Sequence, residues 1–528
     1  MRLCIGLIPF CLLACPAPPV PVDGGSQFFD VGSADTTVPF DASHADVAQR
    51  PADAGFVADA GPTREAQFPP SFGPVWTQRG QFGALSSLRN HDLDGDGVQD
   101  LILGSGHEMA NAGHVTALSG RDGEVLWSHE TTQDIFGSAL IADLGPRPGL
   151  EVVIGGRDAE LYALDAQTGE LLWKFEPFGS AGREADWFNW LALYPIGDLD
   201  GDGWQELLTA NGGDRTRQEF EARDPGQIVV ISSRTGAVLL RALTPDRAET
   251  YMSPVLYEDQ GRQMLLFGTG GETHRGSLWR ISLDLLLETE SLESAQELVE
   301  PTTHKGVIAP PSLVDLTGDG RLDIVVAAFD GRLLALDGVS NDIIWSHHLD
   351  DCETQVTPAI GYFNDDDIPD VFAGFSVGTW PLWSDGKVLA VSGSDGSILY
   401  QEDFDQYWGV SSPLAVDLDG DDRHEVIFQM NQIISGQVTR ILGAIHSVVD
   451  FPSGDRHELL RTDGVSYGTA RVVDLDNDGW LEIAFTHAIG GRWTLEVRQL
   501  DTPVPQLPSW GEYMGPGGRG IFQTRRRP

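Results

Sequence analysis

The chain has 528 residues and carries 79 Asp and Glu against 34 Lys and Arg, which gives a formal net charge of −45. This acidic balance argues against binding of nucleic acid, or of an anionic membrane surface, through a basic face. It suits a protein that binds several cations, because each bound cation would offset part of the self-repulsion.

The first 15 residues predict an exported protein. They contain one basic side chain and an apolar core, and they end in Leu12-Leu13-Ala14-Cys15. Their length and flanks indicate a secretory signal rather than a membrane span. The last four residues resemble the bacterial lipobox, whose cysteine becomes the lipidated first residue of the mature chain; an ordinary cleaved signal is the alternative. The resemblance implies lipidation of Cys15 and, because Pro16 follows it, an outer-membrane lipoprotein that is periplasmic or surface-exposed.

Residues 16–68 predict a disordered linker. They are rich in Ala, Asp, Pro and Gly and show no sustained apolar periodicity, so they cannot bury a core. No later run is long enough to span a bilayer, and contact with a membrane is expected only through the lipid anchor. Once Cys15 is lipidated and the residues before it are removed, Cys352 has no partner, so no disulfide is expected.

Residues 69–520 are built from repeats, and their clearest element is a nine-residue acidic loop that occurs five times. Each copy places side-chain oxygens at positions 1, 3, 5 and 9, and four copies have at position 6 a glycine that permits a sharp turn. Hard oxygen ligands at alternate positions suit Ca²⁺, which accepts about six to eight of them. The pattern predicts about five structural calcium sites with these ligands: Asp92, Asp94, Asp96, Asp100, Asp198, Asp200, Asp202, Glu206, Asp315, Thr317, Asp319, Asp323, Asp417, Asp419, Asp421, Glu425, Asp474, Asp476, Asp478 and Glu482.

The residues after each loop distinguish it from an EF-hand. That motif needs a bidentate glutamate at position 12 and a helix on each side. Here position 12 lies in a run of β-forming residues, such as Leu101-Ile102-Leu103, which predicts a buried strand. Acidic turns that only solubilise strand ends are the alternative to calcium binding.

The units around the loops predict an all-β fold, a β-propeller of about eight four-stranded blades, with seven possible. Each unit contains a strand, a link with glycine, a second strand, a tight turn and a strand that ends in an aromatic residue such as Trp127. The first three gaps between loops are about twice the last, so each gap hides one degenerate unit. These units lie at residues 143–151, 257–263 and 362–370.

Both ends of the repeat region are candidates for closing the ring. A strand around Val75-Trp76, or the segment that begins at Leu507, could supply the fourth strand of the last blade. Residues 521–528 are expected to form a basic tail.

Two resemblances follow from these motifs. The Asp-x-Asp-x-Asp-Gly-x-x-Asp loops resemble FG-GAP/VCBS repeats, the calcium-loop blades of integrin α-chain propellers. Residues 164–173 and 335–345 resemble the repeat of quinoprotein (PQQ) propellers, which usually have eight blades. The resemblances imply a propeller and calcium, but they say little about function, because such propellers serve many purposes. PQQ is not expected, because the adjacent cysteine pair of the alcohol-oxidising enzymes is absent.

The absence of catalytic motifs favours a non-catalytic binding, adhesion or scaffold module at the bacterial cell envelope. The hydrolase motif Gly-x-Ser-x-Gly and the zinc-protease motif His-Glu-x-x-His are both missing. The alternative is a calcium-dependent polysaccharide lyase, because some eight-bladed rhamnogalacturonan lyases have similar calcium loops. A lyase needs a base and cations beside a uronate, and the candidates are His304, Lys305, Arg183, His274, Arg275 and Tyr407.

Aromatic residues collect in the links that strand alternation places on the face opposite the acidic loops. Exposed rings there would suit sugar rings or the anchoring side chains of a partner protein. The alternative is that these rings pack between blades. A protein or glycan ligand is therefore expected, with no nucleic acid, and the candidate ligand face comprises Trp187, Trp190, Trp380, Trp383, Tyr407 and Trp408.

Overall fold

The computed structural model describes the repeat region and its immediate flanks. The described residues are 68–84, 86–107, 112–157, 159–177, 187–214, 217, 220–409, 411–434, 440–505 and 509–524. The signal with Cys15, nearly all of the linker and the lyase candidate Arg183 lie outside them, so the expectations for these segments stay predictions.

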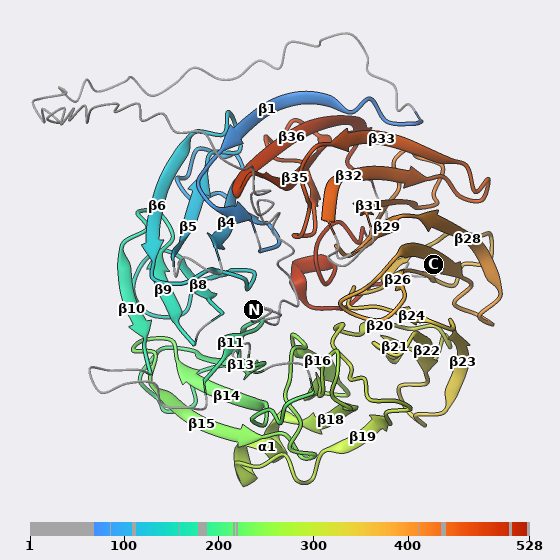
Figure 1. Cartoon of the computed structure of the whole chain (residues 1–528). Coiled ribbons are helices and arrows are strands. Elements are labelled where there is room, and N and C mark those ends of the chain that lie inside the picture. The colour runs from blue at the N-terminus through green and yellow to red at the C-terminus, as the bar shows by residue number, and fades with distance from the viewer. Residues whose placement is uncertain are drawn as a thin grey trace, which may run out of the picture. The chain divides into compact units, whose positions relative to one another are not determined.

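Within the described residues, eight antiparallel sheets form a ring around a central axis (Figure 1), which confirms the predicted propeller. We number the blades in chain order. Blade 1 holds β2 (Gly83–Ala84), β3 (Arg89–His91), β4 (Asp100–His107), β5 (Ala112–Leu118) and β6 (Val125–Thr131). Blade 2 holds β7 (Leu140–Ala142), β8 (Glu151–Gly155), β9 (Leu161–Asp165) and β10 (Leu171–Phe175). Blade 3 holds β11 (Asn189–Trp190), β12 (Tyr194–Pro195), β13 (Glu206–Gly212), β14 (Gln227–Ser232) and β15 (Val238–Leu243).

The remaining blades repeat this order. Blade 4 holds β16 (Val255–Asp259), β17 (Arg262–Gly268), β18 (Leu278–Ser282) and β19 (Gln296–Val299). Blade 5 holds β20 (Ser312–Val314), β21 (Asp323–Ala327), β22 (Arg332–Leu336) and β23 (Ile343–His348). Blade 6 holds β24 (Cys352–Glu353), β25 (Ala359–Gly361), β26 (Asp370–Val377), β27 (Asp385–Val391) and β28 (Ile398–Asp405). Blade 7 holds β29 (Tyr407–Trp408), β30 (Leu414–Val416), β31 (Glu425–Ile434), β32 (Arg440–Val449) and β33 (Arg456–Thr462). Blade 8 holds β34 (Arg471–Val473), β35 (Trp480–Ile489), β36 (Arg492–Pro503) and β1 (Gly73–Arg79).

Helices play a small part in the described chain. Helix α1 (Leu283–Thr289) lies between β18 and β19, and it begins at Ser282, whose hydroxyl accepts a hydrogen bond from the Leu285 amide. A 3₁₀ turn, η1 (Pro516–Gly518), lies near the C-terminus. Neither helix in the described part has the length and apolar character that crossing a membrane requires.

Burial decreases from the middle strands of a blade to its outer strand, and the sequence shows why. In blade 3, every residue of β13 and β14 is buried, because these near-continuous apolar runs are covered on both faces by neighbouring blades. The outer strand β15 instead alternates between exposed and buried residues. The core thus lies within and between the stacked blades, as several apolar clusters distributed around the ring.

The aromatic residue in the outer strand of several repeats joins one blade to the next. The indole Nε1 of Trp127 in blade 1 donates to the carbonyl oxygen of Ala166 in blade 2, at 2.8 Å. Trp345 in blade 5 donates in the same way to Gly393 in blade 6, also at 2.8 Å. The same contact recurs for Trp76 with Gly120 and for Trp173 with Ser233. The repeated tryptophan therefore fixes neighbouring blades through their tight turns.

The N-terminal strand closes the ring. Strand β1 pairs antiparallel with β36, with Trp76 opposite Val497, so blade 8 combines strands from both ends of the described chain. Of the two segments that the sequence offered for this closure, the one around Val75-Trp76 is therefore used.

Residues 509–524, which we call the closing segment, run across the innermost strands instead. The Trp510 amide and carbonyl both bond to Ala415 in blade 7, and Phe522 pairs with Leu313 in blade 5. The carboxylate of Glu512 forms ion pairs with Arg89 in blade 1 and Arg471 in blade 8. Ile521 and Phe522 were expected to begin the basic tail; this was wrong, because Ile521 bridges to β20 and Phe522 is almost fully buried.

Candidate metal loops and a central cavity

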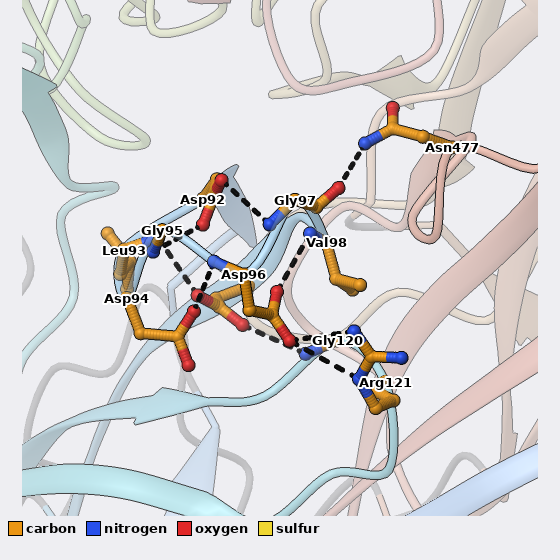
Figure 2. A network of polar contacts seen from close by, with 11 residues as sticks. Asp92, Leu93, Asp94, Gly95, Asp96, Gly97, Val98, Gly120, Arg121 and Asn477 are labelled. Carbon is orange, nitrogen blue, oxygen red and sulfur yellow. Dashed lines mark hydrogen bonds and ion pairs between the residues drawn. The ribbon is translucent and has the colours of Figure 1, made fainter. Parts of the chain in front are cut away.

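The first acidic loop is held open by its own backbone, as Figure 2 shows. The two carboxylate oxygens of Asp92 accept hydrogen bonds from the amides of Gly95, at 2.8 Å, and Gly97, at 3.1 Å. Asp94 and Asp96 each accept one from the amide two residues further on. Gly95 and Gly97 both have positive φ angles, of 80° and 86°, which glycine adopts without strain. The hydrogen bonds within the loop thus fix the positions of its carboxylates.

The other four loops share this arrangement. In each of them, the side chain at position 1 accepts a hydrogen bond from a backbone amide three to five residues later. The side chain at position 9 accepts one from the amide at position 2, as Glu425 does from Leu418 at 2.6 Å. The same bond joins Glu206 to Leu199, Asp323 to Leu316, Glu482 to Leu475 and, in the first loop, Asp100 to Leu93. One spacing in the sequence therefore gives one local structure five times.

Four of the five loops gather three carboxylates each into a group whose oxygens lie within 4.8 Å of one another. Among the described residues, these groups are Asp92, Asp94 and Asp96; Asp198, Asp200 and Glu206; Asp417, Asp419 and Glu425; and Asp474, Asp476 and Asp478. The loop in blade 5 forms no such group, because Thr317 supplies a hydroxyl where the others have a carboxylate.

The residues in these loops fit a divalent cation. Oε1 of Glu206 and Oε1 of Glu425 are buried and have no hydrogen-bond donor. Burial, reinforced by the charges of neighbouring aspartates, raises the pKa of Glu425 to about 9 and that of Glu482 to about 7. A hard cation would supply the positive charge that these oxygens lack.

In two of the degenerate loops, a side chain binds the remaining carboxylates in the place where a cation would bind them. In blade 2, Arg147 places Nη2 at 3.1 Å from Oε1 of Glu151, the position-9 residue, and Nη1 at 3.3 Å from Asp165. In blade 6, the side-chain amide of Asn364 donates to both Asp366 and Asp370. Blade 4 has no loop, since a turn at residues 260–261 joins β16 directly to β17.

The acidic loops and the tight turns lie on one face of the ring. Arg121, in the turn between β5 and β6, donates to Asp96 of the loop in the same blade, and Asn477 reaches Gly97 from the loop of blade 8 (Figure 2). Arg234 contacts Asp202 in blade 3 in the same way. The loops of neighbouring blades are therefore in contact, which the sequence alone did not indicate.

The rings of the candidate ligand face are not exposed platforms. Trp187 and Trp190 stack with centroids 5.4 Å apart beside Phe175, and Trp190 is fully buried. Trp380, Trp383 and Trp408 are buried too, in a cluster that includes Phe329. Only Tyr407 is partly exposed, and its hydroxyl accepts a hydrogen bond from Arg461. The five tryptophans pack within and between blades, which is the alternative that the sequence left open; their ligand role stays a prediction.

A cavity of about 100 Å³ lies on the central axis. Most of its lining immediately precedes the innermost strands, and Arg157 follows the second strand of blade 2, whereas the acidic loops lie between the first and second strands, so the cavity is at the opposite side of the ring. Tyr513 of the closing segment also lines it and donates to the hydroxyl of Ser253 at 3.4 Å. Its lining is Ser87, Phe136, Gly137, Ser138, Arg157, Leu191, Ala192, Tyr251, Ser253, Ile308, Pro310, Gln355, Ser412, Tyr467, Thr469 and Tyr513.

A ring of hydroxyl side chains surrounds this cavity. Six of the eight blades have Ser or Thr two residues before an innermost strand: Ser87, Ser138, Ser253, Thr357, Ser412 and Thr469, with Ala192 and Pro310 in the other two. The backbone amide at this position donates to the hydroxyl of the next blade, as from Thr357 to Ser412 at 3.1 Å and from Thr469 to Ser87 at 3.0 Å. This ring was not predicted from the sequence, although a small or hydroxyl residue stands at a fixed distance before each innermost strand.

Buried charges lie beside the cavity. Arg157 is 3% exposed and its guanidinium lies 5.2 Å from the ring centroid of Phe136. Next to it, Arg223 lies 3.6 Å from Glu249, and burial raises the pKa of Glu249 to about 8. Two lyase candidates belong to this region: Lys305 forms an ion pair with Glu353 at 2.6 Å, and Nδ1 of His274, whose pKa is lowered by burial, lies 3.5 Å from Glu249.

Comparisons with known proteins identify a family of β-propellers to which this chain is similar. A model of the FAM234A/B β-propeller matches residues 110–423. Protein FAM234B of Homo sapiens is 26% identical over 352 residues, which is 60% of this chain and 52% of the human protein. Protein FAM234B of Gallus gallus is 22% identical over 354 residues, 62% of this chain and 53% of that protein. The chain thus spans about half the length of the curated relatives it matches.

Solved structures with the same fold include quinoprotein propellers. A quinohemoprotein alcohol dehydrogenase, ADHIIG, from Pseudomonas putida HK5 has a TM-score of 0.53 at 12% identity and covers 83% of this chain and 79% of its own. The enzyme from Comamonas testosteroni gives 0.52 at 12% identity, covering 84% and 79%. Sqt1 of Saccharomyces cerevisiae gives 0.51 at 11% identity, covering 83% and 100%. The likeness to PQQ-type propellers is confirmed as a likeness of fold alone.

Proposed function

The chain belongs to the FAM234A/B β-propeller family, and we propose that it is a non-catalytic, calcium-stabilised propeller that works as a binding, adhesion or scaffold module. The single observation that supports calcium binding is the shared loop structure. Its carboxylates converge, and two buried carboxylate oxygens, of Glu206 and Glu425, have no hydrogen-bond donor. FG-GAP/VCBS-like loops with Ca²⁺ at these positions would give each of the five blades that carry a loop a cation between its first two strands.

The arrangement of the lyase candidates supports a non-catalytic role. Lys305 forms an ion pair with Glu353, Nδ1 of His274 lies 3.5 Å from Glu249, and Tyr407 contacts Arg461 in blade 7. A base and a charge-stabilising cation must lie beside the same substrate; Tyr407 is in blade 7, apart from Lys305 and His274, and both of these face a buried carboxylate.

The place of action that we propose is the cell envelope, with the propeller anchored to the outer membrane through a lipid on Cys15. The lipobox-like tetrapeptide at residues 12–15 supports it. Cell fractionation of the wild type and of Cys15→Ser tests it: the wild type should follow the membrane fraction and the variant should leave it. Membrane association that survives in the variant would contradict the lipid anchor.

Thermal unfolding with calcium or with a chelator, together with a count of bound ions, tests the central claim. Ions that bind only the folded state raise its stability by mass action, so chelation should lower Tm and about five ions per chain should be bound in calcium. Sites with a Kd near 10⁻⁴ to 10⁻³ M, roughly, would suffice outside cells. An unchanged Tm with no bound ion would refute calcium stabilisation.

A further inference from the structure

The residue at position 9 divides the five acidic loops into two classes. In blades 3, 7 and 8 it is a glutamate, and in blades 1 and 5 it is an aspartate. One oxygen of this carboxylate accepts the amide at position 2 in all five loops. The loops differ in what the other oxygen contacts, and therefore in whether that oxygen is available to a cation.

In the aspartate class, the second oxygen already accepts a backbone amide. Oδ1 of Asp100 accepts the amide of Gly120 at 3.2 Å, and Oδ1 of Asp323 accepts that of Gly338 at 2.9 Å. Both glycines lie in the tight turn between the last two strands of their blade. A Cβ atom on either of them would lie within 2.0 Å of the carbonyl oxygen at position 8, so the turn is held close against the loop. Because amide donors stabilise the negative charge of the carboxylate, a cation has to compete with them for the same oxygen.

In blades 3 and 7 the second oxygen has no donor. Glu206 and Glu425 are fully buried, and among the described residues their Oε1 atoms have no hydrogen-bond partner. The turn position that holds glycine in the aspartate class is occupied here by Ser233 and Phe451. A buried, charged oxygen without a donor costs free energy, and a cation that binds it removes this cost.

The convergence of the carboxylates distinguishes the same two blades. In blades 3 and 7 the oxygens within 4.8 Å of one another come from positions 1, 3 and 9, whereas in blades 1 and 8 they come from positions 1, 3 and 5. Glu482 of blade 8 is therefore outside the converging group of its own loop. In blade 1 that group includes Asp96, which already forms an ion pair with Arg121 at 2.9 Å. A cation in blade 1 must share Asp96 with an arginine, while one in blade 3 or 7 can bind through position 9.

Blade 2 shows that this glutamate oxygen attracts a positive charge. Its position-9 residue, Glu151, is buried and accepts the amide of Leu144 through Oε2, while Oε1 accepts hydrogen bonds from the guanidinium of Arg147. Blades 2, 3 and 7 thus share a buried glutamate whose Oε1 is not bound by the backbone. Blade 2 supplies a cationic side chain to that oxygen, whereas the Oε1 atoms in blades 3 and 7 have no such partner among the described residues.

We propose that position 9 sets the calcium affinity of the acidic loops, and that Glu206 and Glu425 make the loops of blades 3 and 7 the two tight sites. The loops of blades 1, 5 and 8 fill only at higher calcium concentrations. The affinity of a calcium site depends on the charge of its ligands and on its rigidity, and a buried carboxylate oxygen without a donor contributes to both. This inference rests on the proposed calcium binding and adds to it an order of filling.

Equilibrium dialysis of the whole chain against increasing calcium, with a count of bound ions, tests this order. Two ions should bind with a Kd at least about tenfold below that of the others. Binding of all the ions with one Kd, or a tight set of any number other than two, would overturn the inference and leave the calcium role intact. No bound ion at any concentration would overturn both the inference and the proposed function on which it rests.

Matched substitutions at position 9 locate the tight sites. Glu206→Gln and Glu425→Gln should each remove one tight ion. The equivalent change from carboxylate to amide in Asp100→Asn, Asp323→Asn and Glu482→Gln should affect only the weaker set. Loss of a tight ion in any of these three controls, or retention of both tight ions in Glu206→Gln or Glu425→Gln, would overturn the assignment. If a glutamine variant in blade 3 or 7 does not fold, the two steps of the wild type and the three controls still decide the question.

Discussion

The guanidinium of Arg147 lies against the carboxylate of Glu151, with Nε at 3.3 Å and Nη2 at 3.1 Å from the same oxygen. Glu151 also accepts the amide of Leu144 at 3.0 Å, which is the bond that the position-9 residue makes in every acidic loop. Blade 2 thus keeps the loop's backbone but balances its buried carboxylate with a side chain of its own. This relationship predicts that blade 2 does not need a metal ion.

Replacing Arg147 should destabilise the protein equally with and without calcium. In Arg147→Ala the nearly fully buried carboxylate of Glu151 loses its counter-charge, which should lower the free energy of unfolding by about 1–3 kcal/mol. Urea unfolding in calcium and in chelator measures both losses. A loss seen only in calcium would contradict the substitution of a guanidinium for the ion.

Substitutions in a single acidic loop should instead lower stability in calcium and have little effect in chelator. Asp94→Asn or Asp202→Asn should lower Tm in calcium and reduce the ion count by about one, and the difference from the wild type should largely vanish in chelator. The matched control is Asp143→Asn, in the degenerate loop of blade 2, which should change little. If Asp143→Asn lowered the calcium-dependent Tm as much as Asp94→Asn, the loops would not be the binding sites.

The ion pairs of the closing segment should hold the ring together. Although burial alone would raise it, the pKa of Glu512 is lowered by Arg89 and Arg471. Glu512→Gln leaves both guanidinium groups largely buried without a carboxylate, so it should cost about 3–5 kcal/mol of stability. Chemical unfolding measures this, with the exposed Glu288→Gln as control. A loss no larger than that of the control would mean that the closing segment contributes little.

Stability should depend on pH through Glu249. Burial raises its pKa to about 8 from an ordinary value of 4.5, so the folded state favours the protonated carboxyl. This contribution is complete below about pH 4.5 and is lost as the pH rises through about 8. The groups that face Glu249 are Arg223, Glu272, Asp214, Tyr251 and His274.

Unfolding of the calcium-loaded wild type and of Glu249→Gln across that range checks this expectation. The free energy of unfolding of the wild type should fall between about pH 5 and pH 8, and the amide variant should show a shallower fall. Identical slopes in the two proteins would mean that Glu249 is ionised throughout, held so by Arg223.

The sequence was sufficient where local pattern decides structure. The spacing of Asp92, Asp94, Asp96 and Asp100 is enough for the loop, because each carboxylate binds backbone within the same nine residues. The blades followed from the repeat length and from apolar runs that only a buried strand accommodates.

Contacts between residues that are far apart in the sequence could not be predicted from local pattern. The exposure of Trp190 or Trp383 depends on which blade packs beside it, and both proved to be buried. The meeting of Arg147 with Glu151 could have been suspected from a positive charge in an otherwise ligand-free loop. The cavity could not have been predicted, because Arg157, Gln355 and Tyr513, which line it, come from three distant segments of the chain.

The pairing of β1 with β36 has a consequence for how the protein is made. The first strand of the described chain must wait, without its sheet, until the last strand has been synthesised, because blade 8 needs both. Joining segments so far apart is entropically costly and slow. Until β1 pairs with β36, the edge of β36 and the facing surfaces of blades 1 and 8 are open to wrong pairing, so this last step is the one most exposed to misfolding.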